Sequence, residues 1–174
     1  TVIENVEIVA NFDDGVEFFG GNVSAKNLMV YSAGDDGLDI DQSYSGTISN
    51  SVVLVGDLSD SALEIDGPEG SYKASFILNN ITLQGNAVNP GDKYADYRAL
   101  AMGESNNVYA YGFMAGDGVE LDNDGVAKNY NDQVLKFGTW QIVLPTGVTD
   151  VKTIFENKST AVLTPTFGAT AAAV

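Results

Sequence analysis

The sequence predicts an all-β protein, a solenoid whose short strands stack coil upon coil into parallel sheets. Three observations support this prediction. Short segments with a period-2 alternation of apolar residues recur along the chain, and a second series of segments led by asparagine alternates with them. Runs that favour helices are missing, and glycine is abundant, with 19 residues. A repeat of about 22 to 30 residues built from strands and turns is typical of stacked coils.

The first series of segments can be aligned in two apolar columns. The segments are DDGVEFFGG (13–21), DDGLDIDQS (35–43), DSALEIDGP (60–68), YRALAMGES (97–105) and GDGVELDND (116–124). One column holds Val16, Leu38, Leu63, Leu100 and Val119, and the column two residues later holds Phe18, Ile40, Ile65, Met102 and Leu121. Residues two apart in a strand lie on the same face, so we expect both columns to face the core.

The second series of segments is led by a recurring asparagine. The positions are Asn5, Asn27, Asn50, Asn80 and Asn107, at intervals of 22, 23, 30 and 27 residues. We expect these side chains to point inward and to hydrogen-bond along the stack, which would satisfy polar groups beside an apolar core. An antiparallel sandwich whose hairpins resemble one another by chance is the alternative interpretation of the same strands.

The organisation indicates one domain. The 174 residues are enough for a single well-buried core. We expect the solenoid to occupy residues 1–163, with a loop insertion at 86–97 and one more irregular coil at 134–145. Residues 164–174 are expected to be a tail or linker. Because Thr1 opens directly on strand-like sequence, we expect the chain to be part of a longer protein.

Composition restricts the possible partners and chemistry. The chain has 24 acidic and 8 basic residues, for a net charge of −16, which opposes binding to nucleic acid or anionic lipid and favours metal cations or neutral sugars. No apolar stretch is long enough to span a bilayer. Cysteine and histidine are absent, which excludes disulfides, thiolate nucleophiles, imidazole bases and the usual zinc sites. Any catalysis must use carboxylates, Lys, Tyr or the single arginine, Arg98.

Strand alternation places many acids on one outer face. Residues 11–70 contain 12 acidic residues and one base, Lys26, so internal ion pairs cannot neutralise this face. Stacked strands lie about 4.8 Å apart, where neighbouring carboxylates repel by roughly 0.8 kcal/mol even in water. Calcium is the first candidate counter-ion because it accepts several oxygen ligands in flexible geometry. The predicted ligands are Asp14, Asp36, Asp39, Asp41, Glu64, Asp66, Glu120 and Asp122. A solvated acidic surface without a metal is the alternative.

The asparagine-led strands predict a partly aromatic outer face. Alternation from Asn27 places Leu28 inside and Tyr31 outside, and the equivalent outward residues of the last such segment are Tyr109 and Tyr111. Tyrosine rings in a row can stack on sugar faces while their hydroxyls bond to sugar hydroxyls. We therefore predict these three tyrosines as ligand-binding residues, unless the loop insertion or residues 126–163 cover them.

Several segments also resemble a known family. NVEIVANFDDGVEFFGG, NLMVYSAGDDGLDIDQ and ALEIDGPEG make residues 1 to about 145 similar to the right-handed parallel β-helix proteins of the pectate-lyase-like superfamily. In particular, they resemble secreted β-helix proteins of gliding bacteria that use type IX secretion. This resemblance implies an extracellular or outer-surface location, possible contact with secretion or surface-assembly proteins, and further coils before this segment. It is informative about fold, because activity depends on the site.

A partial likeness to two enzyme groups suggests catalytic residues. NFDDG and AGDDG resemble the paired motifs of polygalacturonases, which would make Asp14, Asp35 and Asp36 the acid and base of a hydrolase. The Gly-His-Gly and Arg-Ile-Lys motifs of that family have no counterpart here. Arg98 resembles the base of calcium-dependent polysaccharide lyases, and a structural salt bridge to Asp96 or Glu104 is the alternative.

These observations predict a right-handed parallel β-helix that is a secreted or surface-displayed binding module. We expect it to bind a polysaccharide or cell-surface glycan, with calcium bridging the acidic face. The main alternative is an enzyme that cleaves an acidic polysaccharide as a hydrolase or lyase. The third is a structural or secreted cargo component, because uncapped coil ends expose sheet edges that can pair end to end with another subunit.

Overall fold

The computed structural model describes residues 1–88 and 93–174 and contains two sheets whose paired strands are all parallel. The six-stranded sheet consists of β2 (Val16–Phe19), β4 (Leu38–Asp41), β6 (Leu63–Ile65), β8 (Ala95–Tyr97), β10 (Val119–Leu121) and β13 (Phe155–Asn157), in that spatial order. The eight-stranded sheet consists of β1 (Val2–Val9), β3 (Ser24–Tyr31), β5 (Thr47–Leu54), β7 (Phe76–Gln84), β9 (Gly103–Tyr111), β12 (Trp140–Ile142) and β14 (Ala171–Ala173), with β11 (Leu135–Phe137) also on β9.

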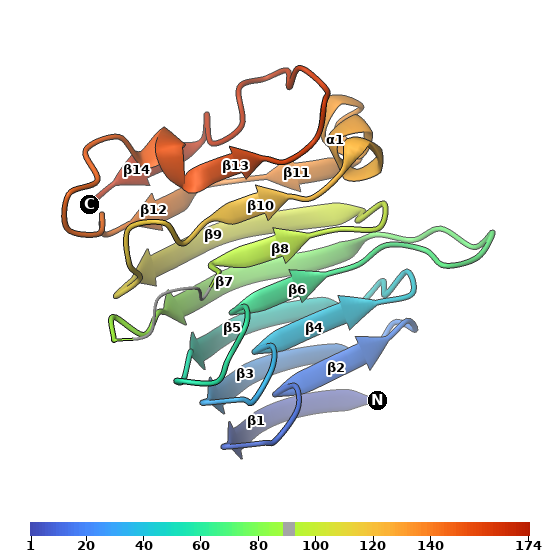
Figure 1. The fold of residues 1–174 in the computed structure, drawn as a ribbon. Coiled ribbons are helices and arrows are strands. Elements are labelled where there is room, and N and C mark those ends of the chain that lie inside the picture. Colours follow the sequence, from blue (N-terminus) through green and yellow to red (C-terminus); the bar gives the residue numbers. More distant parts are fainter. Residues whose placement is uncertain (89–92) are drawn as a thin grey trace.

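The chain alternates between the two sheets and rises by one coil each time it returns (Figure 1). The coils wind in the right-handed sense, with the short strands β2, β4, β6, β8, β10 and β13 on one side and the longer strands behind them. Six strands in the shorter sheet correspond to six windings. The predicted all-β parallel β-helix of about five to six coils is therefore confirmed, and the antiparallel sandwich is excluded.

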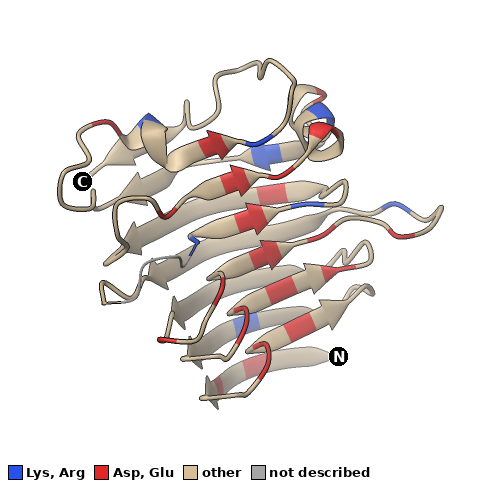
Figure 2. Cartoon of the chain, viewed as in Figure 1, with Lys and Arg blue, Asp and Glu red and all other residues tan. Residues whose placement is uncertain are grey.

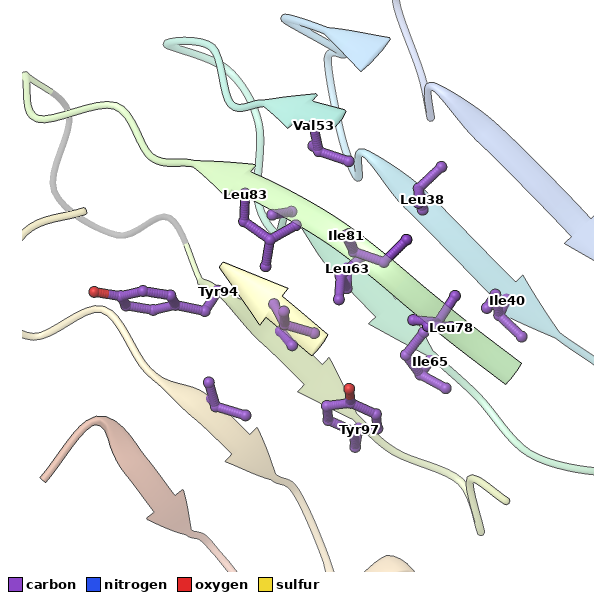
Figure 3. Close-up of a cluster of buried hydrophobic side chains, with 14 of the residues drawn as sticks. Leu38, Ile40, Val53, Leu63, Ile65, Leu78, Ile81, Leu83, Tyr94 and Tyr97 are labelled. Carbon is purple, nitrogen blue, oxygen red and sulfur yellow. The ribbon is translucent and has the colours of Figure 1, made fainter. Parts of the chain in front are cut away.

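The apolar columns form the core between the sheets (Figure 3). Leu38 lies opposite Leu63 and Ile40 opposite Ile65 in parallel register, and all four side chains are buried. Side chains from the longer strands, such as Leu78, fill the space from the other side. Burying an aliphatic side chain of this size contributes about 1.5–3 kcal/mol, so the stacked columns are a main source of stability.

The fourth coil has a different register from the one the sequence predicted. Ala95 and Tyr97 of β8 occupy the two core columns. The register shows this, because Asp96 between them lies opposite Glu64 on one neighbouring strand and opposite Glu120 on the other. Leu100, expected in the first column, is 41% exposed and lies in a turn with a φ of 65°. Both segments alternate in the same way, and packing selects the one whose tyrosine fills the core.

The expected loop insertion at 86–97 must accordingly be shortened. Its last residues, 95–97, form β8 and belong to the sheet. Residues 89–92 of the insertion lie outside the described residues. Met102, which we expected in the second core column, follows the turn and is partly buried just before β9. The extra length of this coil thus falls between β7 and β8.

The asparagines form a ladder, but on the outside of the coil. Their side chains are exposed, which corrects the expectation that they point inward. Asn80 Nδ2 donates to Asn50 Oδ1 at 2.9 Å and Asn107 Nδ2 donates to Asn80 Oδ1 at 2.5 Å. Each asparagine of the series has a positive φ between 51° and 58°, which bends its long strand. Asparagine is favoured there because it tolerates left-handed backbone better than other non-glycine residues.

Two glycines allow the coils to approach closely before the short strands. A Cβ atom on Gly15 would lie 2.3 Å from Val30 Cγ1, and one on Gly37 would lie 2.3 Å from Val53 Cγ1. Such distances are far below van der Waals contact, so any side chain would separate the two sheets. Both glycines directly follow the acidic pairs, and they fix the position of those pairs against the core.

The C-terminal end contains structure that the sequence did not predict. Helix α1 (Asp124–Asn131) begins at Asn123, whose side chain caps Gly125 and Val126. The expected irregular coil is present, because β11 and β12 pair with successive parts of β9. The expected tail, 164–174, instead contains β14, which pairs with β12. Of the helices in the described ranges, none combines the length and apolar character needed to cross a membrane.

Candidate functional site

A ladder of carboxylates follows the outer face of the six-stranded sheet. The second residue of each short strand is acidic, and the register places Asp39 opposite both Glu17 and Glu64. In order along the stack, the ladder consists of Glu17, Asp39, Glu64, Asp96, Glu120 and Glu156. Figure 2 shows these residues as red segments that follow one another from strand to strand. Because adjacent strands lie about 4.8 Å apart, each carboxylate destabilises its neighbours unless a cation compensates the charge.

Two lysines compensate part of the C-terminal half of this ladder. Lys93 Nζ lies 2.9 Å from Asp96 Oδ2 and 3.7 Å from Asp60 Oδ2. Lys158 Nζ lies 3.3 Å from Glu120 Oε1 and 2.5 Å from Glu156 Oε2. Each lysine therefore bridges two carboxylates, which is the arrangement that stacked like charges require.

Arg98 compensates the middle of the ladder. Its Nη2 atom pairs with Glu64 and lies 3.0 Å from Asp66 Oδ2, and its Nε donates to the same Asp66 oxygen at 3.1 Å. Burial lowers the pKa of Arg98, but hydrogen bonding to Asp66 and the charges of Asp66 and Glu64 raise it above its ordinary value. The guanidinium is consequently held in its charged form, and its partners are not those predicted from the sequence.

Among the residues that the structure describes, no comparable cation lies beside the N-terminal half of the ladder. None of the ion pairs formed within residues 1–88 and 93–174 involves Asp14, Glu17, Asp36 or Asp39. Lys26, the single base of residues 11–70, pairs with Glu4 on the eight-stranded sheet. The acidic face is thus divided along the solenoid axis into a compensated half and an uncompensated half.

Three groups of carboxylates gather toward the N-terminal end of this face, and only the third includes a residue with an ion pair, Asp60, which pairs with Lys93. Within each group, oxygens from all three side chains lie within 4.8 Å of one another. The groups are Asp13, Asp14 and Asp35; Asp14, Glu17 and Asp39; and Asp35, Asp36 and Asp60. Asp14 belongs to two of them, and its Oδ1 accepts a hydrogen bond from the Asp36 backbone N–H at 3.0 Å. These distances suit a bridging cation, because calcium binds several carboxylate oxygens at about 2.3–2.6 Å.

Asp39 is the most constrained carboxylate of the second group. Its residue is 8% exposed, and within the described structure its Oδ1 atom is buried without a hydrogen-bond partner. Burial, together with the charges of Asp14, Glu17 and Asp41, raises the pKa of Asp39 to about 8. An unpartnered buried carboxylate oxygen is costly, and a cation among these three side chains would satisfy it.

Asp36 and Glu64 are two further buried carboxyls, and their pKa values are raised. Burial, and then the charge of Glu64, raises the pKa of Asp36 to about 8. Burial also raises the pKa of Glu64 to about 7, although Arg98 acts in the opposite direction. Asp36 Oδ1 is another buried oxygen that lacks a hydrogen-bond partner in the described part of the chain. The two carboxyls belong to successive coils, and the charge of Glu64 adds to the effect of burial on the pKa of Asp36.

The eight predicted metal ligands do not form one site. Asp14 and Asp39 lie in one group, and Asp36 lies in another. The other five predicted ligands belong to none of the three groups. Glu64 and Asp66 pair with Arg98, and Glu120 pairs with Lys158. Asp41 Oδ1 accepts a hydrogen bond from the Gln42 backbone N–H, and Asp122 Oδ2 accepts one from Asn123 Nδ2. Bases of the later coils therefore pair with Glu64, Asp66 and Glu120, and the binding of metal by the predicted ligands stays a prediction.

The predicted catalytic residues lie at the same turns. Asp35 is shared between the group that contains Asp14 and the group that contains Asp36, so all three predicted hydrolase residues lie close together. Within each group, one oxygen of each side chain lies within 4.8 Å of the others. Arg98 follows β8, and the position of the fourth coil that corresponds to Asp14, Asp36 and Ser61 is occupied by Lys93, which lies opposite Ser61. The double pairing of Arg98 with carboxylates opposes a role as a base.

The predicted aromatic face is accessible. Tyr31 is 49% exposed and Tyr109 is 39% exposed, so neither the described part of the insertion nor residues 126–163 cover them. Tyr31 and Tyr111 line a groove of about 710 Å³ at the ends of the long strands. Tyr109 does not line this groove, but its ring centroid lies 5.6 Å from that of Tyr111.

Strand alternation places Glu17 on the outer face in the column of Asp39, but the predicted metal ligands did not include it. Two other members of the ladder, Asp96 and Glu156, and the bases beside them were missed. Asp96 and Lys93 were missed because the fourth coil was aligned five residues too late. Glu156 belongs to a coil without recognisable similarity to the others, so the sequence offered no signal for it.

Comparison with known proteins places this geometry in a family. The family model of the pectate-lyase-like β-helix domain matches residues 1–173. No curated protein and no solved structure matches the chain significantly. The match covers nearly the whole sequence and agrees with the two parallel sheets, and it supports a carbohydrate-related β-helix. The chain therefore belongs to the pectate-lyase-like β-helix family.

Proposed function

We propose that this β-helix is a binding module that holds an acidic polysaccharide on its six-stranded sheet through bound divalent cations, with calcium as the first candidate. The observation that carries this proposal is the division of the carboxylate ladder. Lys93, Arg98 and Lys158 neutralise its C-terminal half, whereas Asp14, Glu17 and Asp39 cluster without a base in the described residues. A metal ion would supply in the first coils the charge that these side chains supply in the later ones.

The ligand chemistry of the cluster favours calcium among the common metals. Every candidate ligand is a carboxylate oxygen, and the chain contains neither cysteine nor histidine. Oxygen-only sites suit calcium and magnesium, and calcium tolerates the irregular geometry of side chains from adjacent coils. Zinc, copper and nickel sites ordinarily need nitrogen or sulfur ligands.

An acidic polysaccharide fits a cation held on this surface. The net charge of −16 would repel a uronate polymer in the absence of metal. A calcium ion bound by three protein carboxylates retains further coordination positions, which carboxylates of the polymer can occupy. The ladder extends along the solenoid axis, so it presents an elongated surface to an elongated ligand. We propose an extracellular or cell-surface location, in keeping with this ligand class.

Calcium titration of the purified domain tests the first part of the proposal. Isothermal titration calorimetry should detect calcium binding to the unmodified protein, and Glu17→Gln should weaken it by at least tenfold. Glu7→Gln is the matched control, because it removes one exposed carboxylate from the same coil on the opposite sheet. Equal affinity in both variants would contradict the assignment.

Retention on polygalacturonate tests the second part. Binding should occur with calcium, disappear with a chelator, and be lost in Glu17→Gln but not in Glu7→Gln. The same incubation distinguishes binding from cleavage, because a lyase would release unsaturated products and a hydrolase would release reducing ends. Calcium binding without retention on this or any other uronate polymer would leave the metal site intact and reject the acidic ligand.

A further inference from the structure

A second concave surface lies at the ends of the long strands and shares no residue with the three carboxylate groups. This groove of about 710 Å³ is formed where β3, β5, β7 and β9 lead into the turns toward the short strands. Tyr31 and Tyr111 line it, together with the amide side chains of Gln84 and Asn86 and the exposed side chain of Leu58. It therefore combines aromatic rings with hydrogen-bonding groups.

The two tyrosines belong to one outward column of the eight-stranded sheet. Tyr31 lies opposite Leu54, which lies opposite Gln84, and Gln84 lies opposite Tyr111. Three strand spacings separate the rings, which corresponds to about 14 Å along the solenoid axis. The groove is thus long enough for several sugar units lying across successive coils.

Glycines allow the turns that line the groove to pack closely against the neighbouring coils. A Cβ atom on Gly56 would lie 2.1 Å from Ser32 Oγ, and one on Gly85 would lie 2.4 Å from Phe113 Cγ. Side chains are therefore excluded at both positions by packing against the coil. Gly112, at the far end, has a φ of 76°, which also favours glycine. Gly56 and Gly85 are themselves buried, so the groove offers a ligand the tyrosine rings and the amide side chains of Gln84 and Asn86.

Internal hydrogen bonds hold the polar residues of the groove in place. The Tyr111 hydroxyl donates to Gln84 Oε1 at 2.7 Å, and Asn86 Nδ2 donates to Asp57 Oδ1 at 2.5 Å. The Tyr109 ring packs beside Tyr111 with an interplanar angle of 35°. These contacts reduce the side-chain entropy that a ligand would otherwise have to remove on binding.

We infer that this groove is a binding site for neutral glycan, with Tyr31 and Tyr111 stacking on sugar faces and Gln84 and Asn86 bonding to sugar hydroxyls. Of the described residues that line the groove, none is basic and Asp57 is acidic, which disfavours anionic ligands. Its amide side chains disfavour a lipid or a purely apolar peptide. Open aromatic surfaces with fixed amides suit a hydroxyl-rich ligand. This site needs no cation, and its function is independent of the acidic face.

Binding of neutral oligosaccharides in the presence of EDTA tests this inference. The probes are hexasaccharides of β-1,4-glucan, β-1,3-glucan, β-1,4-xylan and β-1,4-mannan, measured by calorimetry at millimolar concentration. At least one should bind, and Tyr31→Ala and Tyr111→Ala should each weaken that binding by tenfold or more. Tyr72→Ala is the matched control, because Tyr72 is 70% exposed and does not line the groove. Glu17→Gln should leave this binding unchanged.

Tyr111→Phe separates stacking from a general loss of structure. It retains the ring and removes the bond to Gln84, so it should weaken binding less than Tyr111→Ala while the melting temperature stays constant. The inference is overturned if no hexasaccharide binds, if Tyr31→Ala and Tyr72→Ala behave alike, or if binding requires calcium and is lost in Glu17→Gln. The last result would assign the glycan to the acidic face instead.

Discussion

Glu17 lies directly opposite Asp39 in the parallel pair of β2 and β4, and neither carboxylate forms an ion pair with any base in the described ranges. Four coils later along the same ladder, Glu120 lies opposite Glu156 and Lys158 bridges them. The same strand geometry therefore occurs with and without an internal cation. This contrast within one molecule gives the following predictions.

Removal of Lys93 should convert a compensated part of the ladder into an uncompensated one. Lys93→Gln leaves Asp96, whose side chain is 6% exposed, without its cation, and should lower the free energy of unfolding by about 1–3 kcal/mol. Calcium should then stabilise this variant more than it stabilises the unmodified protein, because Asp96 and Asp60 become available as ligands. Thermal melts with calcium and with EDTA measure both effects, and equal calcium responses would refute the idea that lysine and metal are interchangeable here.

Stability without divalent cations should fall as the pH rises from about 4 to about 8. The pKa of Asp39 is raised from 3.8 to about 8, so the folded state binds more protons than the unfolded state throughout this interval. The contribution of protonated Asp39 to the free energy of unfolding is fully present below about pH 4, and it is lost progressively as the pH rises to about 8. Asp36 contributes in the same direction, with a pKa of about 8. Melting temperatures in EDTA across this range provide the measurement.

Asp39→Asn should reduce that pH dependence. The amide cannot acquire the buried charge, so the variant should melt several degrees above the unmodified protein at pH 8 in EDTA and close to it at pH 4. Calcium should no longer raise its melting temperature to the same extent. If the variant were instead less stable at pH 8 in EDTA, the Asp39 carboxylate would be favourably solvated or paired.

Arg98→Ala should be much more destabilising than Lys128→Ala. Arg98 pairs with side chains of Glu64 and Asp66 that are 11% and 15% exposed, whereas Lys128 and Asp132 are 71% and 49% exposed. We expect a loss of about 2–4 kcal/mol for the first variant and less than about 1 kcal/mol for the second. Urea unfolding gives both values, and similar losses would show that the Arg98 pairs are effectively solvated.

The register of the fourth coil can be checked by two alanine substitutions. Tyr97→Ala removes a fully buried ring that packs near Phe76 and Phe137, and should cost about 3–5 kcal/mol. Leu100→Ala removes a side chain that is 41% exposed in a turn, and should cost less than about 1 kcal/mol. The alignment of Leu100 with Leu63, which the sequence suggested, predicts the reverse order of stability.

The fold could be predicted from the sequence because each coil carries the same local pattern. Leu38, Ile40, Leu63 and Ile65 alternate within strands and recur between them, and only stacked coils bury both columns. The fourth coil was misaligned because Tyr94–Tyr97 and Leu100–Met102 alternate in the same way, and the choice between them depends on core volume. The position of the asparagines was wrong for a related reason, since their left-handed backbone turns the side chain outward from a strand that otherwise alternates.

The candidate site could be predicted in part. The excess of acid in residues 11–70 follows directly from composition, and the structure gathers Asp14 and Asp39 in one group as the stacking implied. The pairing of Arg98 with Glu64 and Asp66 could not be predicted, because it depends on the register of β8. The contact of Lys158 with Glu120 crosses 38 positions of irregular sequence, over which no repeat is recognisable.

Anomalous diffraction from crystals grown with manganese, or soaked with a lanthanide as a calcium substitute, tests the central claim most directly. The account predicts a peak among the carboxylates of Asp14, Glu17 and Asp39, with metal–oxygen distances of about 2.0–2.6 Å. It also predicts no peak beside Lys158, where Glu120 and Glu156 are already compensated. Density for metal only at exposed carboxylates outside the cluster, or none at all at saturating concentration, would contradict it.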